Sequence, residues 1–211
     1  MTILAFDLVG KVQRVSAIDL LGGPKHDSVP AYDTTLYFQD FLNPSRGAQQ
    51  VADEAYQAIT DGWRAVKLKI GRGGRWMLPE AGMQRDIDVV LGVREAVGSD
   101  VKIYLDANFG YDNRFDLLDR FIKEVTPADI FWFEEMITHS IDGYKQMREI
   151  LAKYGSAALL TCGEVDHDPI SEIFQDLIVG GLIDGYQPDI VGHGYCLLYT
   201  SPSPRDLSTS R

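Results

Sequence analysis

From about residue 30 onward, the chain alternates short apolar runs with longer amphipathic stretches. Several of the short runs are rich in β-branched or aromatic residues, and they are too short to form helices. They predict six strands, at residues 29–36, 65–70, 102–105, 130–133, 158–161 and 185–188.

The stretches between these runs carry apolar residues at helical spacing. One stripe recurs at i, i+3, i+4, i+7 and i+8, and it consists of Ile170, Ile173, Phe174, Leu177 and Ile178. Asp168 and Pro169 predict the start of this helix, and the glycine pair at 180–181 predicts its end. Similar stripes predict helices over 115–125 and from residue 87 to about 97.

Strands that alternate with helices predict parallel pairing with right-handed crossovers. Six such units of about 30 residues each indicate an α/β fold, a partial (β/α)8 TIM barrel with about six of its eight units. An open doubly wound sheet has the same alternation, but no dinucleotide-binding glycine fingerprint follows the first strand. Gly71, Gly73 and Gly74 follow the second strand with the wrong spacing for a phosphate loop, and we interpret them as a flexible loop.

Composition narrows the class of protein. Hydrophobic residues make up 45% and charged residues 24% of the 211 residues, as in globular proteins. No apolar run approaches the roughly 20 residues of a membrane span, and the start lacks a signal peptide, so a cytoplasmic location is expected. A net charge of −11 argues against nucleic-acid or membrane partners. Cys162 and Cys196 have no metal-type spacing, and no disulfide is expected.

Polar residues follow five predicted strands in succession. Their order is Lys67 and Lys69, Asp106 and Asn108, Glu134 and Glu135, Glu164, and Asp189. Any one of them alone is better explained by a helix cap or a loop charge. In a barrel, however, all five strand ends meet on the face where active sites lie, so the series predicts a functional site.

The residue types indicate which chemistry this site performs. Asp106, Glu134 and Glu164 would repel one another unless a cation lay between them, and an all-oxygen ligand set favours Mg²⁺ over Ca²⁺ or Mn²⁺. Such an ion stabilises an enediolate made from a carboxylate substrate. Lys67 and Lys69 share one face of a strand, where a lowered pKa would allow one of them to act as a base. The alternative is two lysines that merely border a strand.

Four motifs in this order resemble those of the enolase superfamily: K-x-K at 67–69, D-A-N at 106–108, W-F-E-E at 132–135 and C-G-E at 162–164. Residues 5–11 and 20–23 resemble the helix and turn that lead from the family's α+β capping domain into its barrel. The resemblance covers residues 4 to 193. Met136 departs from it, because relatives usually have proline after the paired glutamates.

The resemblance implies a role for each site residue. Asp106, Glu134 and Glu164 would ligate Mg²⁺, and Asn108 would lie near the metal and the substrate. Lys69 would abstract the proton α to the substrate carboxylate, while Lys67 would lower the pKa of Lys69 and contact that carboxylate. Glu164 as third ligand, and Asp189 where other subgroups carry a lysine, indicate the mandelate racemase subgroup. Asp189 would there orient a histidine from a seventh strand.

The resemblance also predicts how the chain is divided. Residues 1–25 are expected to be the end of a capping domain, 26–195 an incomplete barrel, and 196–211 a tail that resembles translated adapter or vector sequence. The seventh and eighth strands would then be absent, and this fragment is expected to be poorly soluble and inactive. None of His26, His139, His167 and His193 is expected to replace the seventh-strand histidine.

For the intact parent, the resemblance implies a homo-oligomeric enzyme that acts on a small carboxylate. Dehydration of an aldonate or aldarate to a 2-keto-3-deoxy acid is the leading hypothesis. The alternatives are a racemase or epimerase of 2-hydroxy acids, a non-catalytic barrel that binds a sugar or metal, and an inactive fragment.

Overall fold

The computed structural model describes residues 2–24, 26–166 and 170–189. The predicted helix start at Asp168 and Pro169, His167, His193 and the tail at 196–211 lie outside these residues. Contacts divide the described chain into two compact units. The first contains 2–24, 26–30, 163–166, 170–174 and 187–189, and the second contains 31–162 and 175–186. The domain bounds expected from the sequence remain a prediction.

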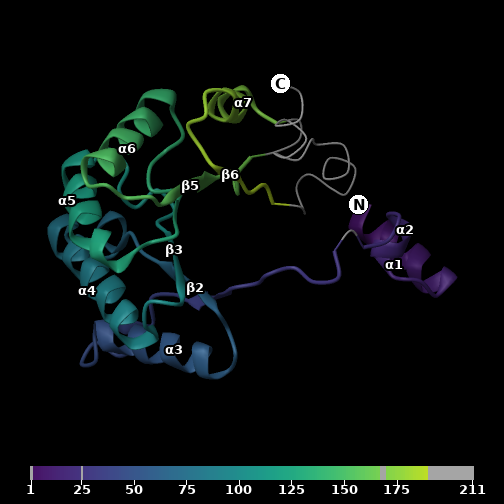
Figure 1. The fold of residues 1–211 in the computed structure, drawn as a ribbon, viewed down its shortest axis with the longest axis horizontal. Coiled ribbons are helices and arrows are strands. Elements are labelled where there is room, and N and C mark those ends of the chain that lie inside the picture. The colour runs from purple at the N-terminus through teal and green to yellow at the C-terminus, as the bar shows by residue number, and fades with distance from the viewer. Residues whose placement is uncertain (1, 25, 167–169, 190–211) are drawn as a thin grey trace. The chain divides into compact units, whose positions relative to one another are not determined.

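The second unit is built on one sheet of six strands (Figure 1). The strands pair in chain order, and every pair is parallel. Their bounds are β1 Asp33–Leu36, β2 Ala65–Lys69, β3 Lys102–Asp106, β4 Trp132–Glu134, β5 Leu159–Cys162 and β6 Gly185–Tyr186. Consecutive order without a reversal distinguishes this sheet from a doubly wound one, and it confirms six units of a (β/α)8 barrel.

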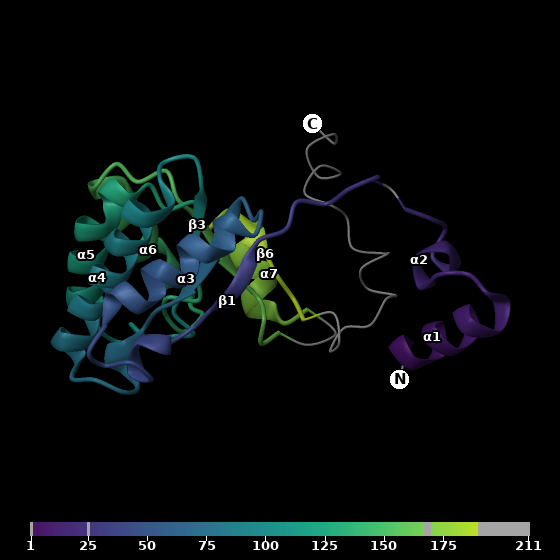
Figure 2. The same ribbon diagram turned by 90° about the horizontal axis from the view of Figure 1, so that it is seen from below.

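Helices connect the strands, and α3 to α6 form a layer on one side of the sheet (Figures 1 and 2). The α-helices after β1 are α3 Ala48–Thr60, α4 Pro79–Val97, α5 Phe115–Val125, α6 Ile141–Lys153 and α7 Glu172–Val179. Short 3-10 helices occur at η1 Gln39–Phe41, η2 Arg72–Gly74 and η3 Thr126–Ala128. The predicted helix at 115–125 is confirmed at both ends.

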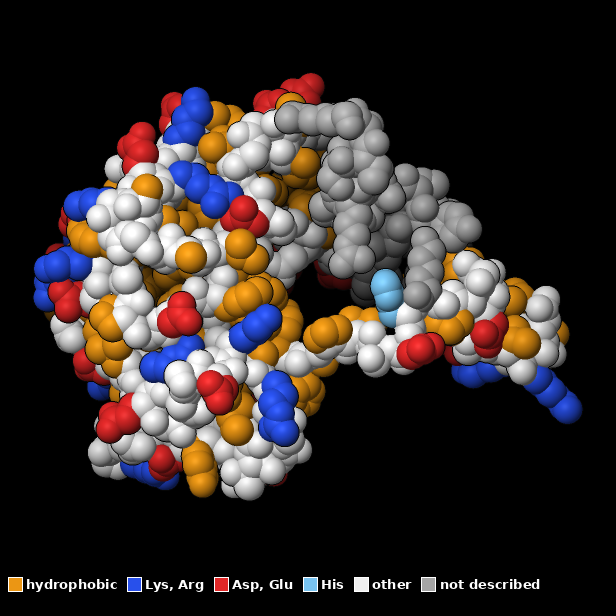
Figure 3. Space-filling model, in the orientation of Figure 1, with side chains coloured by type: hydrophobic (Ala, Val, Ile, Leu, Met, Phe, Trp, Pro, Cys, Tyr) orange, Lys and Arg blue, Asp and Glu red, His pale blue; other side chains and the backbone are white. Residues whose placement is uncertain are grey.

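The core of this unit lies between the sheet and the helices. In α5 the residues Leu118, Ile122 and Val125 of the apolar stripe are buried, together with Leu117 and Phe121. The strands contribute residues with almost no exposed surface, among them Val66, Leu68, Ile103, Leu105 and Phe133. Acidic and basic side chains are interspersed over the outer side of the helical layer, as a solvated surface requires (Figure 3).

The glycine cluster after β2 is not the flexible loop expected from the sequence. Residues 72–74 form the packed 3-10 turn η2, and Gly71 before it has a left-handed φ of 91°. A Cβ on Gly73 would lie 2.6 Å from the carbonyl oxygen of Pro79, and one on Gly74 would lie 2.7 Å from that of Gly110. Glycine is required here because three backbone segments meet closely.

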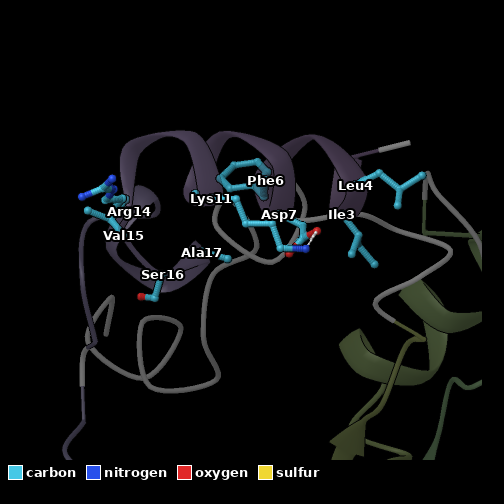
Figure 4. Close-up of a pocket in the computed structure, with 10 residues that line it drawn as sticks. Ile3, Leu4, Phe6, Asp7, Lys11, Arg14, Val15, Ser16 and Ala17 are labelled. Carbon is cyan, nitrogen blue, oxygen red and sulfur yellow. Dashed lines mark hydrogen bonds and ion pairs between the residues drawn. The ribbon is translucent and has the colours of Figure 1, made fainter.

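In the first unit, a helical hairpin joins α1 Thr2–Gln13 to α2 Ala17–Leu20. Ser16 and Asp19 form a capping box at the start of α2, because each side chain accepts a hydrogen bond from the other residue's backbone N–H. Figure 4 shows the groove beside α1, in which Lys11 pairs with Asp7 at 2.7 Å. No helix within the described residues has the length and apolar character to cross a membrane.

Candidate active site

The register of the sheet brings the polar strand ends together. Lys69 at the end of β2 pairs with Asp106 at the end of β3, and Asp106 pairs with Glu134 at the end of β4. All three side chains are buried, with Asp106 fully buried. The prediction that these residues share one edge of the sheet is therefore confirmed in the second unit.

Lys67 bridges two carboxylates. Its Nζ lies 2.9 Å from Oε1 of Glu134 and 3.1 Å from Oδ2 of Asp106. These residues come from three neighbouring strands, and the lysine side chain is 11% exposed. One ammonium group thus compensates charge on two acidic side chains that would otherwise repel each other.

Lys69 lies on the same face of β2, as the two-residue spacing predicts. Its Nζ forms a short ion pair with Oδ2 of Asp106 and donates to Oδ1 of Asn108 at 2.6 Å. Asn108 has a left-handed φ of 41°, and its backbone N–H donates to Oδ1 of Asp106 at 3.1 Å. The Lys69 Nζ also lies over the ring of Tyr37, 5.7 Å from its centroid. The ammonium is thus fixed by two oxygens at one strand end.

The charges in this cluster shift two pKa values upward. Burial acts to lower the pKa of Lys67, but the charges and hydrogen bonds of Asp106 and Glu134 outweigh it and hold this pKa above its ordinary range. Burial, followed by the charge of Asp106, raises the pKa of Glu134 to about 7, although Lys67 opposes this. The raised pKa of Lys67 suits a cation rather than a base.

The third predicted ligand follows β5. Glu164 comes two residues after Cys162, the last residue of that strand, and it belongs to the first unit. Its place as the third ligand, beside Asp106 and Glu134 of the second unit, therefore remains a prediction. The predicted ligand atoms are all carboxylate oxygens. Those of Asp106 and Glu134 contact lysine ammonium groups. This ligand set fits a hard cation such as Mg²⁺.

Asp189 and two of the histidines lie elsewhere along the chain. Asp189 lies three residues after β6 and belongs to the first unit, so its role remains a prediction. His26 also belongs to the first unit. His139 lies between β4 and α6, where its Nε2 is 3.5 Å from Oε1 of Glu135.

A buried ion network beside Lys69 was missed from the sequence. The Arg72 guanidinium is fully buried, and it pairs with Asp40 at 2.7 Å and with Asp86 at 2.7 Å. It also donates to the backbone oxygen of Lys69 at 3.3 Å. Asp86 accepts further hydrogen bonds from Tyr111 and from two backbone N–H groups. This network joins the segments that follow β1, β2 and β3. The sequence did not predict it, because an arginine between two glycines has no pattern that indicates burial.

Comparison with known proteins places this chain in a family. A model described as enolase C-terminal domain-like matches residues 50–194. The chain is 32% identical over 195 residues to D-galactarolactone cycloisomerase of Agrobacterium fabrum, a match that covers 91% of this chain and 46% of that protein. The chain spans less than half the length of the curated relatives that it matches.

Solved structures agree with this match. A mandelate racemase/muconate lactonizing protein from Geobacillus sp., complexed with magnesium and tartrate, has a TM-score of 0.75 and 30% identity over 89% of this chain and 49% of its own. Galacturonate Dehydratase from Geobacillus sp., complexed with D-galacturonate and 5-keto-4-deoxy-D-galacturonate, has a TM-score of 0.69 and 32% identity over 77% of this chain and 43% of its own. The family model matches more than half of this chain. The chain therefore belongs to the enolase C-terminal domain-like family, in the mandelate racemase group of the enolase superfamily.

Proposed function

We propose that this chain supplies the base and the metal-binding carboxylates of an enzyme that removes the proton α to the carboxylate of an acid sugar. One observation carries the proposal: two lysine ammonium groups contact two buried carboxylates at neighbouring strand ends. This arrangement supports a proton acceptor beside a site for a hard cation, and α-proton removal needs both.

Each residue has a proposed task. Lys69, once neutral, accepts the α-proton, and Asn108 orients its Nζ through the 2.6 Å hydrogen bond. Lys67 stays cationic, in line with its raised pKa, and binds the substrate carboxylate. Asp106, Glu134 and Glu164 would hold Mg²⁺, which would offset the negative charge that develops on the substrate.

For a 2,3-dihydroxy acid, the proposed reaction is dehydration. The α C–H bond breaks and its proton passes to Lys69, while the electron pair forms a C=C bond and the β-hydroxyl leaves with a proton as water. The resulting enol takes up a proton at C3, gives up the proton of its C2 hydroxyl and becomes a 2-keto-3-deoxy acid. The dehydratase and the cycloisomerase among the relatives support sugar acids as the substrate class.

Racemisation is the second candidate. It begins with the same proton removal, but the proton returns to the α-carbon from the opposite face, where Asp189 would orient the second acid. The neighbour described as a mandelate racemase/muconate lactonizing protein favours this candidate. Because both reactions exchange the α-proton and only dehydration releases a keto acid, a product assay separates them.

The metal is tested first, because its binding requires no turnover. Titration calorimetry of the whole chain with MgCl₂ is expected to show one site, and Asp106→Asn is expected to abolish it. Asp88→Asn, on the outer part of α4, is the control and is expected to bind Mg²⁺ like the unaltered chain. Equal binding by both variants would contradict the ligand assignment.

The base is tested by solvent exchange. With Mg²⁺ and a panel of aldonates and aldarates in D₂O, the protein is expected to incorporate deuterium at the α-carbon and, as a dehydratase, to release a 2-keto acid. Lys69→Met should stop incorporation, whereas Lys123→Met on the exposed side of α5 should not. Incorporation that survives in Lys69→Met would refute this residue as the base.

A further inference from the structure

The loop after β4 carries a buried acidic residue that the proposed chemistry does not use. Glu135 follows the proposed ligand Glu134 and is 1% exposed. Neither of its carboxylate oxygens accepts a hydrogen bond from the described residues, and the ion-pair partner that the structure gives it is Nε2 of His139, at 3.5 Å. A buried carboxylate is costly unless a partner compensates it, so this contact requires an explanation.

The backbone of Glu135 connects this pair to the loop after β3. Its carbonyl oxygen accepts a hydrogen bond of 2.6 Å from the backbone N–H of Phe109. The imidazole of His139 packs edge-on against the ring of Phe109, with 5.2 Å between centroids, and lies 6.2 Å from the ring of Tyr144 on α6. His139 thus contacts the loop after β3 and the helix after β4 at the same point.

Both loops adopt backbone conformations that side chains disfavour. Asn108, Phe109 and Glu135 all have left-handed φ values, of 41°, 66° and 44°. Such conformations persist only where the surroundings enforce them, and they concentrate at functional sites. Here they aim the Asn108 side chain at the Lys69 Nζ, to which its Oδ1 is hydrogen-bonded at 2.6 Å.

We propose that Glu135 and His139 form a positioning pair that fixes the turn at Asn108 and Phe109, and through it the orientation of Lys69. The proposal rests on the proposed function insofar as Lys69 is the base. Neither residue of the pair touches the substrate or gives up a proton in the reaction. Their contact holds the Glu135 carbonyl oxygen where the Phe109 N–H reaches it.

Hydrogen exchange in the metal-free chain tests the pair without any turnover. His139→Phe keeps a ring between Phe109 and Tyr144 but removes the nitrogen that faces Glu135. It is expected to accelerate exchange of the Phe109 amide about tenfold, through local opening of this turn. The internal control is the backbone N–H of Ala107, which donates to the backbone carbonyl oxygen of Glu134 at 3.1 Å. Its exchange rate should not change.

Two further variants separate positioning from general packing. His139→Gln restores a donor without the ring and should return the Phe109 exchange rate to near its original value. In the double variant Glu135→Gln/His139→Phe, the Phe109 amide should exchange no faster than in His139→Phe alone. The reason is that both substitutions remove the same contact. Unchanged exchange at Phe109, or equal acceleration at Ala107, would overturn the proposal.

Kinetics provide the link to Lys69. In the Mg²⁺-loaded protein, His139→Phe is expected to lower kcat for α-proton exchange about tenfold with KM unchanged, because the base is misaligned while substrate binding is retained. An unchanged kcat in a variant whose Phe109 amide exchanges faster would overturn the link to the base. If the unaltered protein exchanges no α-proton, the proposed function fails, and the amide rates still decide whether the pair holds the turn.

Discussion

The Nζ of Lys67 lies 2.9 Å from Oε1 of Glu134, across two strand boundaries of one sheet. The same Nζ lies 3.1 Å from Oδ2 of Asp106, so one ammonium group compensates both carboxylates. An ion and an ammonium group would compete for these oxygens. Metal binding is therefore expected to loosen this pair and to release Lys67 toward an anionic substrate.

Magnesium binding should depend on pH through Glu134. Burial and the charge of Asp106 raise its pKa from 4.5 to about 7, so a metal must displace a proton from it below that pH. The Mg²⁺ affinity is expected to fall by up to about tenfold per pH unit below pH 7, and to level off above it. Calorimetry in buffers of different ionisation enthalpy should also detect the released proton, and a flat profile from pH 5 to 8 would contradict this assignment.

The same shift affects the stability of the metal-free chain. Because the folded-state pKa of Glu134 lies above its unfolded value of 4.5, its contribution to stability is present below about pH 4.5 and is lost as pH rises through 7. Mg²⁺ should therefore raise the urea midpoint more at pH 8 than at pH 6. Glu134→Gln should remove most of that pH difference, and equal stabilisation at both pH values would show that Glu134 is not the group involved.

Removal of Lys67 should separate metal binding from catalysis. In Lys67→Met the carboxylates of Asp106 and Glu134 lose their compensating cation, so Mg²⁺ affinity is expected to rise about tenfold at pH 8, through stronger Coulomb attraction. Proton exchange should nevertheless fall, because the substrate carboxylate loses its partner. Calorimetry and deuterium incorporation on the same sample check both effects, and weaker Mg²⁺ binding would indicate that Lys67 supports the metal site.

Strand ends were predictable from the sequence because two simple regularities fix them. Short β-branched and aromatic runs located all six strands, and parallel pairing in chain order then brought Lys69, Asp106 and Glu134 to one edge. The sequence did not predict which charged side chains form ion pairs with each other. The Lys67 contact with Glu134 depends on side-chain directions across three strands, and no local pattern encodes them.

Two glycines of helix α4 should respond oppositely to the same substitution. A Cβ on Gly82 would overlap the backbone of Gly73, whereas the first neighbour of a Cβ on Gly92 would be the Cβ of Ala52 at 3.8 Å. Gly82→Ala is expected to destabilise the fold by about 2 kcal/mol through forced backbone movement. Gly92→Ala should stabilise it by about 0.5 kcal/mol through helix propensity. Urea unfolding of both variants checks this, and a stable Gly82→Ala protein would mean that η2 can move away from α4.

The glycine turn also shows where sequence reasoning fails. Glycine next to glycine is typical of flexible loops, and nothing nearby in the sequence signals a packed turn. The packing depends on Pro79 at the start of α4 and on Gly110, which is distant in sequence and approaches only in the folded chain. Arg72 was overlooked for the same reason, since its partners Asp40 and Asp86 lie 32 and 14 residues away.

Arg72 should be the most sensitive charged residue outside the proposed chemistry. Its guanidinium is fully buried between Asp40 and Asp86, so Arg72→Met leaves two buried carboxylates with one partner removed. Breaking such a buried pair costs about 3–5 kcal/mol, and a large drop in the urea midpoint is expected. Arg114→Met, which removes two ion pairs on the surface, is the matched control and should leave the midpoint unchanged. Because Arg72 also donates to the Lys69 backbone oxygen at 3.3 Å, any Arg72→Met protein that folds should show faster amide exchange around Lys69. Equal midpoints for the two variants would show that the network contributes no net stability.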